Sequence, residues 1–140
     1  MQGASYQSLR RLVAFTQASY FLVTGFWPLL NIRSFEWISG PKVDRWLVKT
    51  VSALIAVIGS VIGLAAWRRR LTPEIELLGV GSSLALATID VIYVARRRIR
   101  RVYLLDAVAE AALAATWLIA RRLPAETAPA PGPKRADSDR

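Results

Sequence analysis

The sequence predicts an all-α membrane protein: a four-transmembrane-helix bundle with short basic loops and a disordered C-terminal tail. Three observations predict this fold class. Of the 140 residues, 54% are hydrophobic. Lys and Arg (19) nevertheless outnumber Asp and Glu (10), which leaves a net charge of +9. The apolar residues gather in four long runs with basic clusters between them, an arrangement typical of chains that span a membrane.

Each apolar run is long enough to cross a bilayer. A helix that rises ~1.5 Å per residue needs ~20 apolar residues to span the hydrocarbon core. The predicted helices occupy about residues 12–30, 46–67, 75–95 and 102–120. A soluble bundle is the alternative, but the second run has no charged face. The first run is too long for a typical secretory signal and is followed by no cleavage site, so we expect it to be a permanent helix.

The connections separate one domain from a tail. The longest connection, NIRSFEWISGPKVDRW, is rich in aromatic residues, and we expect it to lie in the headgroup layer. The four-helix domain is predicted to cover residues 1–122. Residues 123–140 are rich in Ala, Pro and charged residues and are expected to be disordered. Basic residues are nearly balanced between the two membrane faces, so charge leaves the orientation open.

Small and polar residues fall on one stripe of each predicted helix when successive residues are placed about 100° apart. Those expected to pack one helix against another are Ser52, Ala56, Gly59, Gly63, Gly79 and Ser83. Gly59 and Gly63 form a G-x-x-x-G motif, which lets helix backbones approach closely. The stripe on the first helix contains Gln17, Tyr20, Thr24 and Asn31. The four stripes predict one shared interior.

Ionisable residues inside the predicted helices form a candidate intramembrane polar site. Its members are Lys49, Asp90, Tyr103, Asp106 and Glu110. An ionised side chain at the bilayer centre costs at least ~2.5 kcal/mol, so it must be neutralised, paired or hydrated. Lys49 and the arginines of the loops could neutralise the carboxylates, which would make the cluster structural. The carboxylates could instead bind a cation, a proton or a polar ligand; for Glu110, the deepest of them, the functional interpretation is preferred.

Composition also limits the function. The chain has no Cys and no His, which excludes thiol nucleophiles, Ser-His triads, haem ligation by His and His- or Cys-based zinc sites. We therefore expect no catalytic residue, no metal site, no cofactor and no enzymatic activity. The first hypothesis is a structural or assembly-forming membrane bundle, as a homo-oligomer or with another membrane protein. The alternative is a small proton- or cation-responsive transporter or ligand-binding bundle.

The expected surroundings follow from the same pattern. The lipid bilayer is the expected environment, and the basic loops should attract anionic lipid headgroups. Nucleic acid is not an expected partner, because no basic stretch belongs to a soluble module.

One stretch carries a resemblance to a family. The segments WPLLNIRSFEWISGPKVDRWLVKT and IDVIYVARRRIRRVYLLDAVAE resemble a family of uncharacterised small four-helix bacterial integral membrane proteins. The resemblance covers roughly residues 20–120, and GPKVDRWLVKT is its most distinctive part. It implies a location in the bacterial inner (plasma) membrane as a multi-pass protein. It implies no activity and no catalytic or ligand-binding residues.

Overall fold

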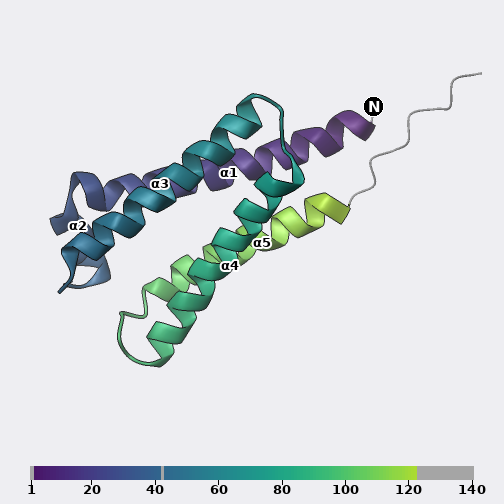
Figure 1. The fold of residues 1–140 in the computed structure, drawn as a ribbon. Coiled ribbons are helices and arrows are strands. Elements are labelled where there is room, and N and C mark those ends of the chain that lie inside the picture. Colours follow the sequence, from purple (N-terminus) through teal and green to yellow (C-terminus); the bar gives the residue numbers. More distant parts are fainter. Residues whose placement is uncertain (1, 42, 123–140) are drawn as a thin grey trace, which may run out of the picture.

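The computed structural model describes residues 2–41 and 43–122 and contains four long helices (Figure 1). They are α1 (Gln2–Leu30), α3 (Arg45–Trp67), α4 (Pro73–Ala95) and α5 (Tyr103–Arg122). Each contains a stretch long and apolar enough to cross a membrane. The predicted fold class, an all-α protein with four membrane-spanning helices, is therefore confirmed. The predicted tail at residues 123–140 lies outside the described residues.

A fifth helix, α2 (Ile32–Ser39), lies in the long connection after α1. The side chain of Asn31 caps its N-terminus by accepting from the Ser34 backbone amide at 3.0 Å. Gly40 ends it with a φ of 91°, a conformation that favours glycine. A two-bond ion pair from Arg45 to Glu36, at 2.7 and 2.8 Å, then ties α2 to the first residue of α3. The sequence predicted this segment at the headgroup layer but without a helix.

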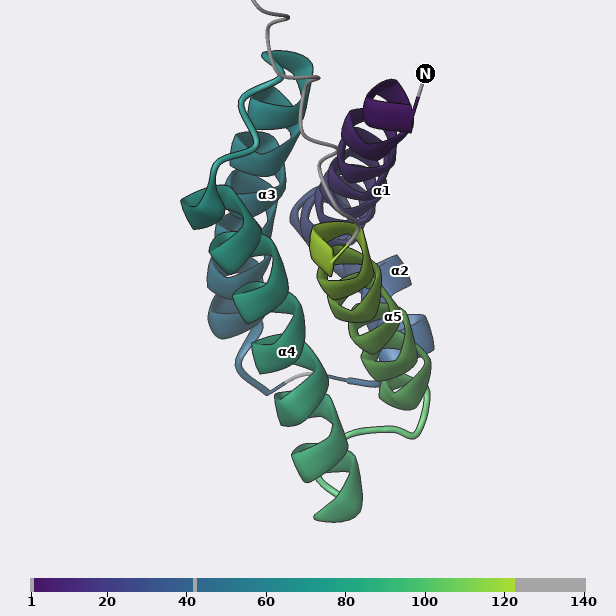
Figure 2. The same ribbon diagram turned by 90° about the vertical axis from the view of Figure 1, so that its right-hand side faces the viewer.

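The four long helices form two antiparallel pairs. In both views α1 runs beside α3 and α4 runs beside α5, and the axes of the two pairs are inclined to each other (Figures 1 and 2). Because the long helices alternate in direction, α2 and the connection after α4 lie at the same end. The Arg100 side chain lies against Gly40, where an added Cβ would be 2.9 Å from its Nε. The two connections therefore lie on the same side of the bundle.

Close backbone packing holds α1 to α3. A Cβ added at Gly59 would lie 2.8 Å from the Phe21 Cβ and 3.1 Å from the Ala18 carbonyl oxygen. A Cβ at Gly25 would lie 2.8 Å from the Ala56 backbone nitrogen and 2.8 Å from the Ser52 carbonyl oxygen. Lipid supplies no hydrophobic drive between helices, so such close contact is what stabilises a membrane helix pair.

The two pairs meet along the first half of α1. Small and aliphatic residues of α1, α3 and α5 form a buried cluster there with one large aromatic ring. Its members are Val13, Ala14, Ala18, Ile62, Ala66, Trp117 and Ala120. Large apolar side chains on the outer faces, such as Val57 and Leu105, are exposed and contact lipid. Several of the buried polar residues lie in the interior between α1, α4 and α5.

Candidate functional site

A single glutamine joins α1 to both α4 and α5. Gln17 is completely buried, and its amide nitrogen donates to the Gly79 carbonyl oxygen at 2.8 Å and to the Ser83 hydroxyl at 2.9 Å. Its amide oxygen accepts from the Trp117 Nε1 at 2.6 Å. A Cβ at Gly79 would lie 2.8 Å from the Gln17 Oε1, so the network needs glycine at this position. The polar atoms of the Gln17 amide are thus all used within the protein.

A second part of the interior carries carboxyl groups. Asp106 and Glu110 are four residues apart on α5 and therefore lie on one face of that helix. Tyr20 of α1 donates a hydrogen bond from its hydroxyl to Asp106. Asp90 of α4 is buried. The interior thus holds three carboxyl groups from two helices, and one of them accepts a hydrogen bond from Tyr20.

Glu110 is the most deeply placed of these groups. It is 2% exposed, and the Ser83 hydroxyl is its hydrogen-bonding neighbour. Its second oxygen, Oε2, is buried and has no hydrogen-bond partner. Because Ser83 also accepts from Gln17, the glutamine network and the carboxyl group are continuous. We call the combined set the polar seam: Gln17, Tyr20, Ser83, Asp90, Asp106, Glu110 and Trp117.

In the part of the chain that the structure describes, no basic side chain forms an ion pair with either carboxyl group of α5. Within residues 2–41 and 43–122, the ion pairs are Arg10 with Glu76 and Arg45 with Glu36. Lys49 is exposed and is not among the groups whose charge acts on Tyr20 or Glu110. The salt bridges that the structural interpretation of the charges required are therefore not formed by Asp106 or Glu110 in the described part of the chain.

The remaining candidate residues lie in different places. Tyr103 is half-buried at the first residue of α5. Residues Ser52, Ala56 and Gly59 form the buried face of α3 against α1, away from the carboxyl groups, whereas Gly63 is half-buried and would place a Cβ 3.2 Å from that of Ala18. The predicted packing stripes therefore serve two contacts, α1 with α3 and α1 with α4 and α5.

Two contributors were missed by the sequence analysis. Trp117 lies seven residues after Glu110, which places both on the same face of α5, and this spacing was a usable signal. Gly25 packs against α3 as closely as Gly59 packs against α1, but it lies in an apolar run with no second small residue to form a motif.

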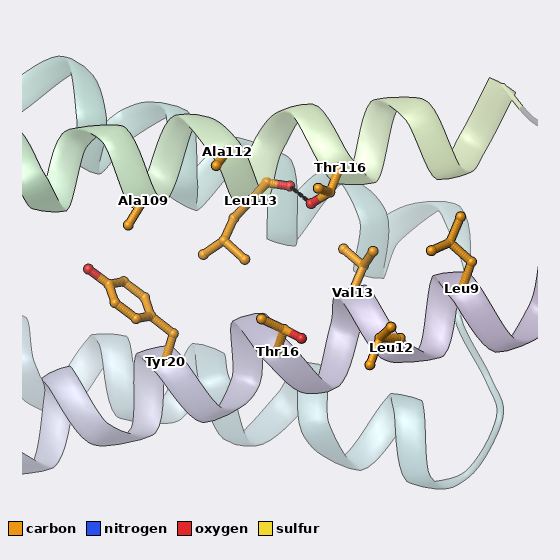
Figure 3. Close-up of a pocket in the computed structure, with 9 residues that line it drawn as sticks. All are labelled: Leu9, Leu12, Val13, Thr16, Tyr20, Ala109, Ala112, Leu113 and Thr116. Carbon is orange, nitrogen blue, oxygen red and sulfur yellow. Dashed lines mark hydrogen bonds between the residues drawn. The ribbon is translucent and has the colours of Figure 1, made fainter.

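An apolar groove runs beside the polar seam. It lies between α1 and α5, has a volume of about 440 Å³ and is lined mostly by aliphatic side chains. Figure 3 shows Tyr20 at one end of the groove, with its hydroxyl directed toward α5, and Leu9 at the other end. Tyr20 thus separates the groove from Asp106. The groove offers apolar contact and no charged group.

Comparison of the chain with protein-family models, with curated proteins and with solved structures finds no match in any of the three. The resemblance noted in the sequence is thus supported only to the extent that the chain has four membrane-spanning helices. The structure establishes a multi-pass integral membrane protein of helical type, in contact with the lipid bilayer.

Proposed function

We propose that this chain is a non-catalytic, proton-responsive membrane bundle in which Glu110 binds the proton. The single observation that supports this function is the Glu110 Oε2, a buried carboxyl oxygen without a hydrogen-bond partner. A protonated carboxyl group is a hydrogen-bond donor as well as an acceptor, so an added proton would give this oxygen a bonding role. Glu110 forms no ion pair within residues 2–41 and 43–122, and burial of an unpaired carboxyl group favours its neutral form.

The neighbours of Glu110 strengthen this argument. The charged group that acts on Glu110 is Asp106, which lies four residues earlier on the same helix. Asp106 is an acid, and the hydrogen-bonding neighbour of Glu110, Ser83, is an uncharged hydroxyl. An ionised Glu110 would therefore add a like charge beside Asp106, and an ionised side chain at the bilayer centre costs at least ~2.5 kcal/mol. Binding and release of a proton would alter the packing of α1 against α4 and α5.

A proton fits this cluster better than a metal ion does. In the described part of the chain, no group of three or more carboxylate side chains is arranged to hold a metal. A proton needs only one carboxyl oxygen, and Glu110 offers one. Of the proton- and cation-responsive alternatives that the sequence left open, the geometry thus favours the proton.

The test is an infrared pH titration of the full chain in liposomes, with Glu110→Gln as the variant. We expect wild-type protein at neutral pH to show the carbonyl band of a protonated carboxyl group and Glu110→Gln to lack it. Glutamine is uncharged and similar in shape to protonated glutamic acid, so the free energy of unfolding should change by less than about 1 kcal/mol.

Glu74→Gln is the matched control, because Glu74 is exposed in the first turn of α4 and lies outside the polar seam. This variant should keep the wild-type band. A band that persists in Glu110→Gln, or loss of folded protein from that substitution alone, would refute the assignment.

The low burial of α4 within the protein supports a second candidate function, an assembly-forming subunit. Only 17% of the apolar window of α4 is buried within the protein, the lowest share among the four spans. We propose the bacterial inner membrane as the location of either form. Step-wise photobleaching of labelled copies, diluted in liposomes, should show two or more steps per particle if the chain self-associates. Single steps at all protein-to-lipid ratios would exclude the homo-oligomer.

A further inference from the structure

A second cavity lies at the membrane face where α4 begins and α5 ends. It has a volume of about 500 Å³ and is bounded by α4, α5 and the first part of α1. Its polar lining consists of Arg10, Glu76 and Arg121, and its apolar lining includes Leu77, Val80 and Leu118. Unlike the apolar groove between α1 and α5, this cavity contains charged groups.

The charges in this cavity are not balanced. Arg10 forms an ion pair with Glu76 and also donates to the Leu71 carbonyl oxygen at 3.1 Å. Arg121 is exposed and makes no ion pair with any residue in the described ranges. One guanidinium group is therefore available at the mouth of the cavity, and Glu76, the acidic residue of the lining, already pairs with Arg10. A guanidinium group pairs well with phosphate oxygens because it can form two parallel hydrogen bonds.

Polarity changes with depth along the cavity. Pro73 is the first residue of α4 and Val80 lies seven residues further along, a distance of ~10 Å along the helix axis. Arg121 belongs to the last turn of α5, so the cation lies at the membrane surface and the aliphatic side chains lie toward the hydrocarbon. The cavity thus combines an exposed guanidinium group at its mouth with aliphatic side chains, which lie beside the Arg10–Glu76 ion pair. This is the complement of a lipid that joins a phosphate to acyl chains.

We propose that this cavity is a binding site for one anionic phospholipid, with the lipid phosphate at Arg121 and the first acyl carbons against Leu77 and Leu118. Basic pockets between membrane helices are suited to anionic headgroups. Such a lipid would bridge α4 and α5 next to the Arg10–Glu76 ion pair, which joins α4 to α1. The site does not depend on protonation of Glu110.

The test is native mass spectrometry of the full chain released from a neutral detergent. Phosphatidylglycerol and phosphatidylcholine with identical acyl chains are added at equal concentrations. We expect the phosphatidylglycerol adduct to be about fivefold more abundant, as one basic residue near the surface predicts, and Arg121→Gln to abolish this preference. Arg122→Gln is the matched control, because Arg122 is the next residue of the same helix and does not line the cavity.

Three results would overturn the proposal. Equal binding of the two lipids by the wild-type chain would show that the headgroup charge is not recognised. An equal loss of the preference in Arg121→Gln and Arg122→Gln would show general attraction to a basic surface. Displacement of phosphatidylglycerol by inorganic phosphate at the same concentration would show that the site takes the ion alone and not the lipid.

Discussion

Replacing Gly59 with leucine is expected to disrupt the packing of α1 against α3 and to lower the free energy of unfolding by about 3 kcal/mol. Even the first added carbon would lie 2.8 Å from the Phe21 Cβ and 3.1 Å from the Ala18 carbonyl oxygen. Backbone atoms cannot move aside without separating the helices. The measurement is reversible unfolding in mixed micelles, followed as the fraction of denaturing detergent is increased.

A graded set of alanine variants makes this prediction specific. Gly59→Ala should destabilise the protein, and Gly63→Ala should do so less, because its Cβ would meet only the Ala18 Cβ at 3.2 Å. Gly81→Ala is the control, since nothing lies within 4 Å of an added Cβ at this exposed position of α4. Gly81→Ala should be neutral or stabilising, by up to ~1 kcal/mol, because alanine favours a helix. Equal stability of Gly59→Leu and Gly81→Leu would contradict the close packing described for α1 and α3.

The second large effect is expected from Gln17→Leu, which should lower the free energy of unfolding by about 2 kcal/mol. The substitution removes three interhelical hydrogen bonds, each worth ~0.6 kcal/mol in a membrane protein. It also leaves the Trp117 indole N–H buried without its acceptor. The same unfolding assay measures the change.

Ser19→Leu provides the comparison for Gln17→Leu, because Ser19 is an exposed polar residue two positions further along α1. This variant should unfold like the wild-type protein. A double-mutant cycle of Gln17→Leu with Trp117→Phe should then show coupling, since the two side chains share one hydrogen bond. Purely additive effects, or a Gln17→Leu protein as stable as Ser19→Leu, would contradict the central role of the glutamine.

The long helices could be predicted from the sequence, whereas the short helix α2 could not. The four spans were predictable because an apolar run of about 20 residues has few alternatives to a membrane helix. The capped α2 was not predicted, although Asn31 and Ser34 supply its N-terminal hydrogen bond, because its eight residues are too few for a clear hydrophobic period. Helix length is a strong signal in a membrane chain, and short helices at its surface are a weak one.

For the candidate site, the sequence predicted which face of each helix is polar, but not which helices those faces contact. Helical periodicity placed Asp106 and Glu110 on one side of α5, and burial of Glu110 agrees with that face. Periodicity does not tell which helix a face meets, because every outer surface in lipid is equally apolar. The small residues of α3 were thus assigned to a shared interior, whereas Ser52 and Ala56 contact α1 near Gly25. Lys49 shares their stripe but lies exposed, at a position where its long side chain is free to extend to the membrane surface.

The hydrogen bond between Gln17 and Trp117 joins residues 100 positions apart, which has a consequence for biogenesis. The ribosome completes α1 long before it completes α5, so the glutamine enters the bilayer while its final donor has not yet been synthesised. During that interval its amide oxygen needs a substitute partner, such as water or the insertion machinery. The hydrogen bonding of Gln17 is thus completed only when the last helix is in place, and a chain interrupted before its final span would expose an unsatisfied amide to cellular quality control.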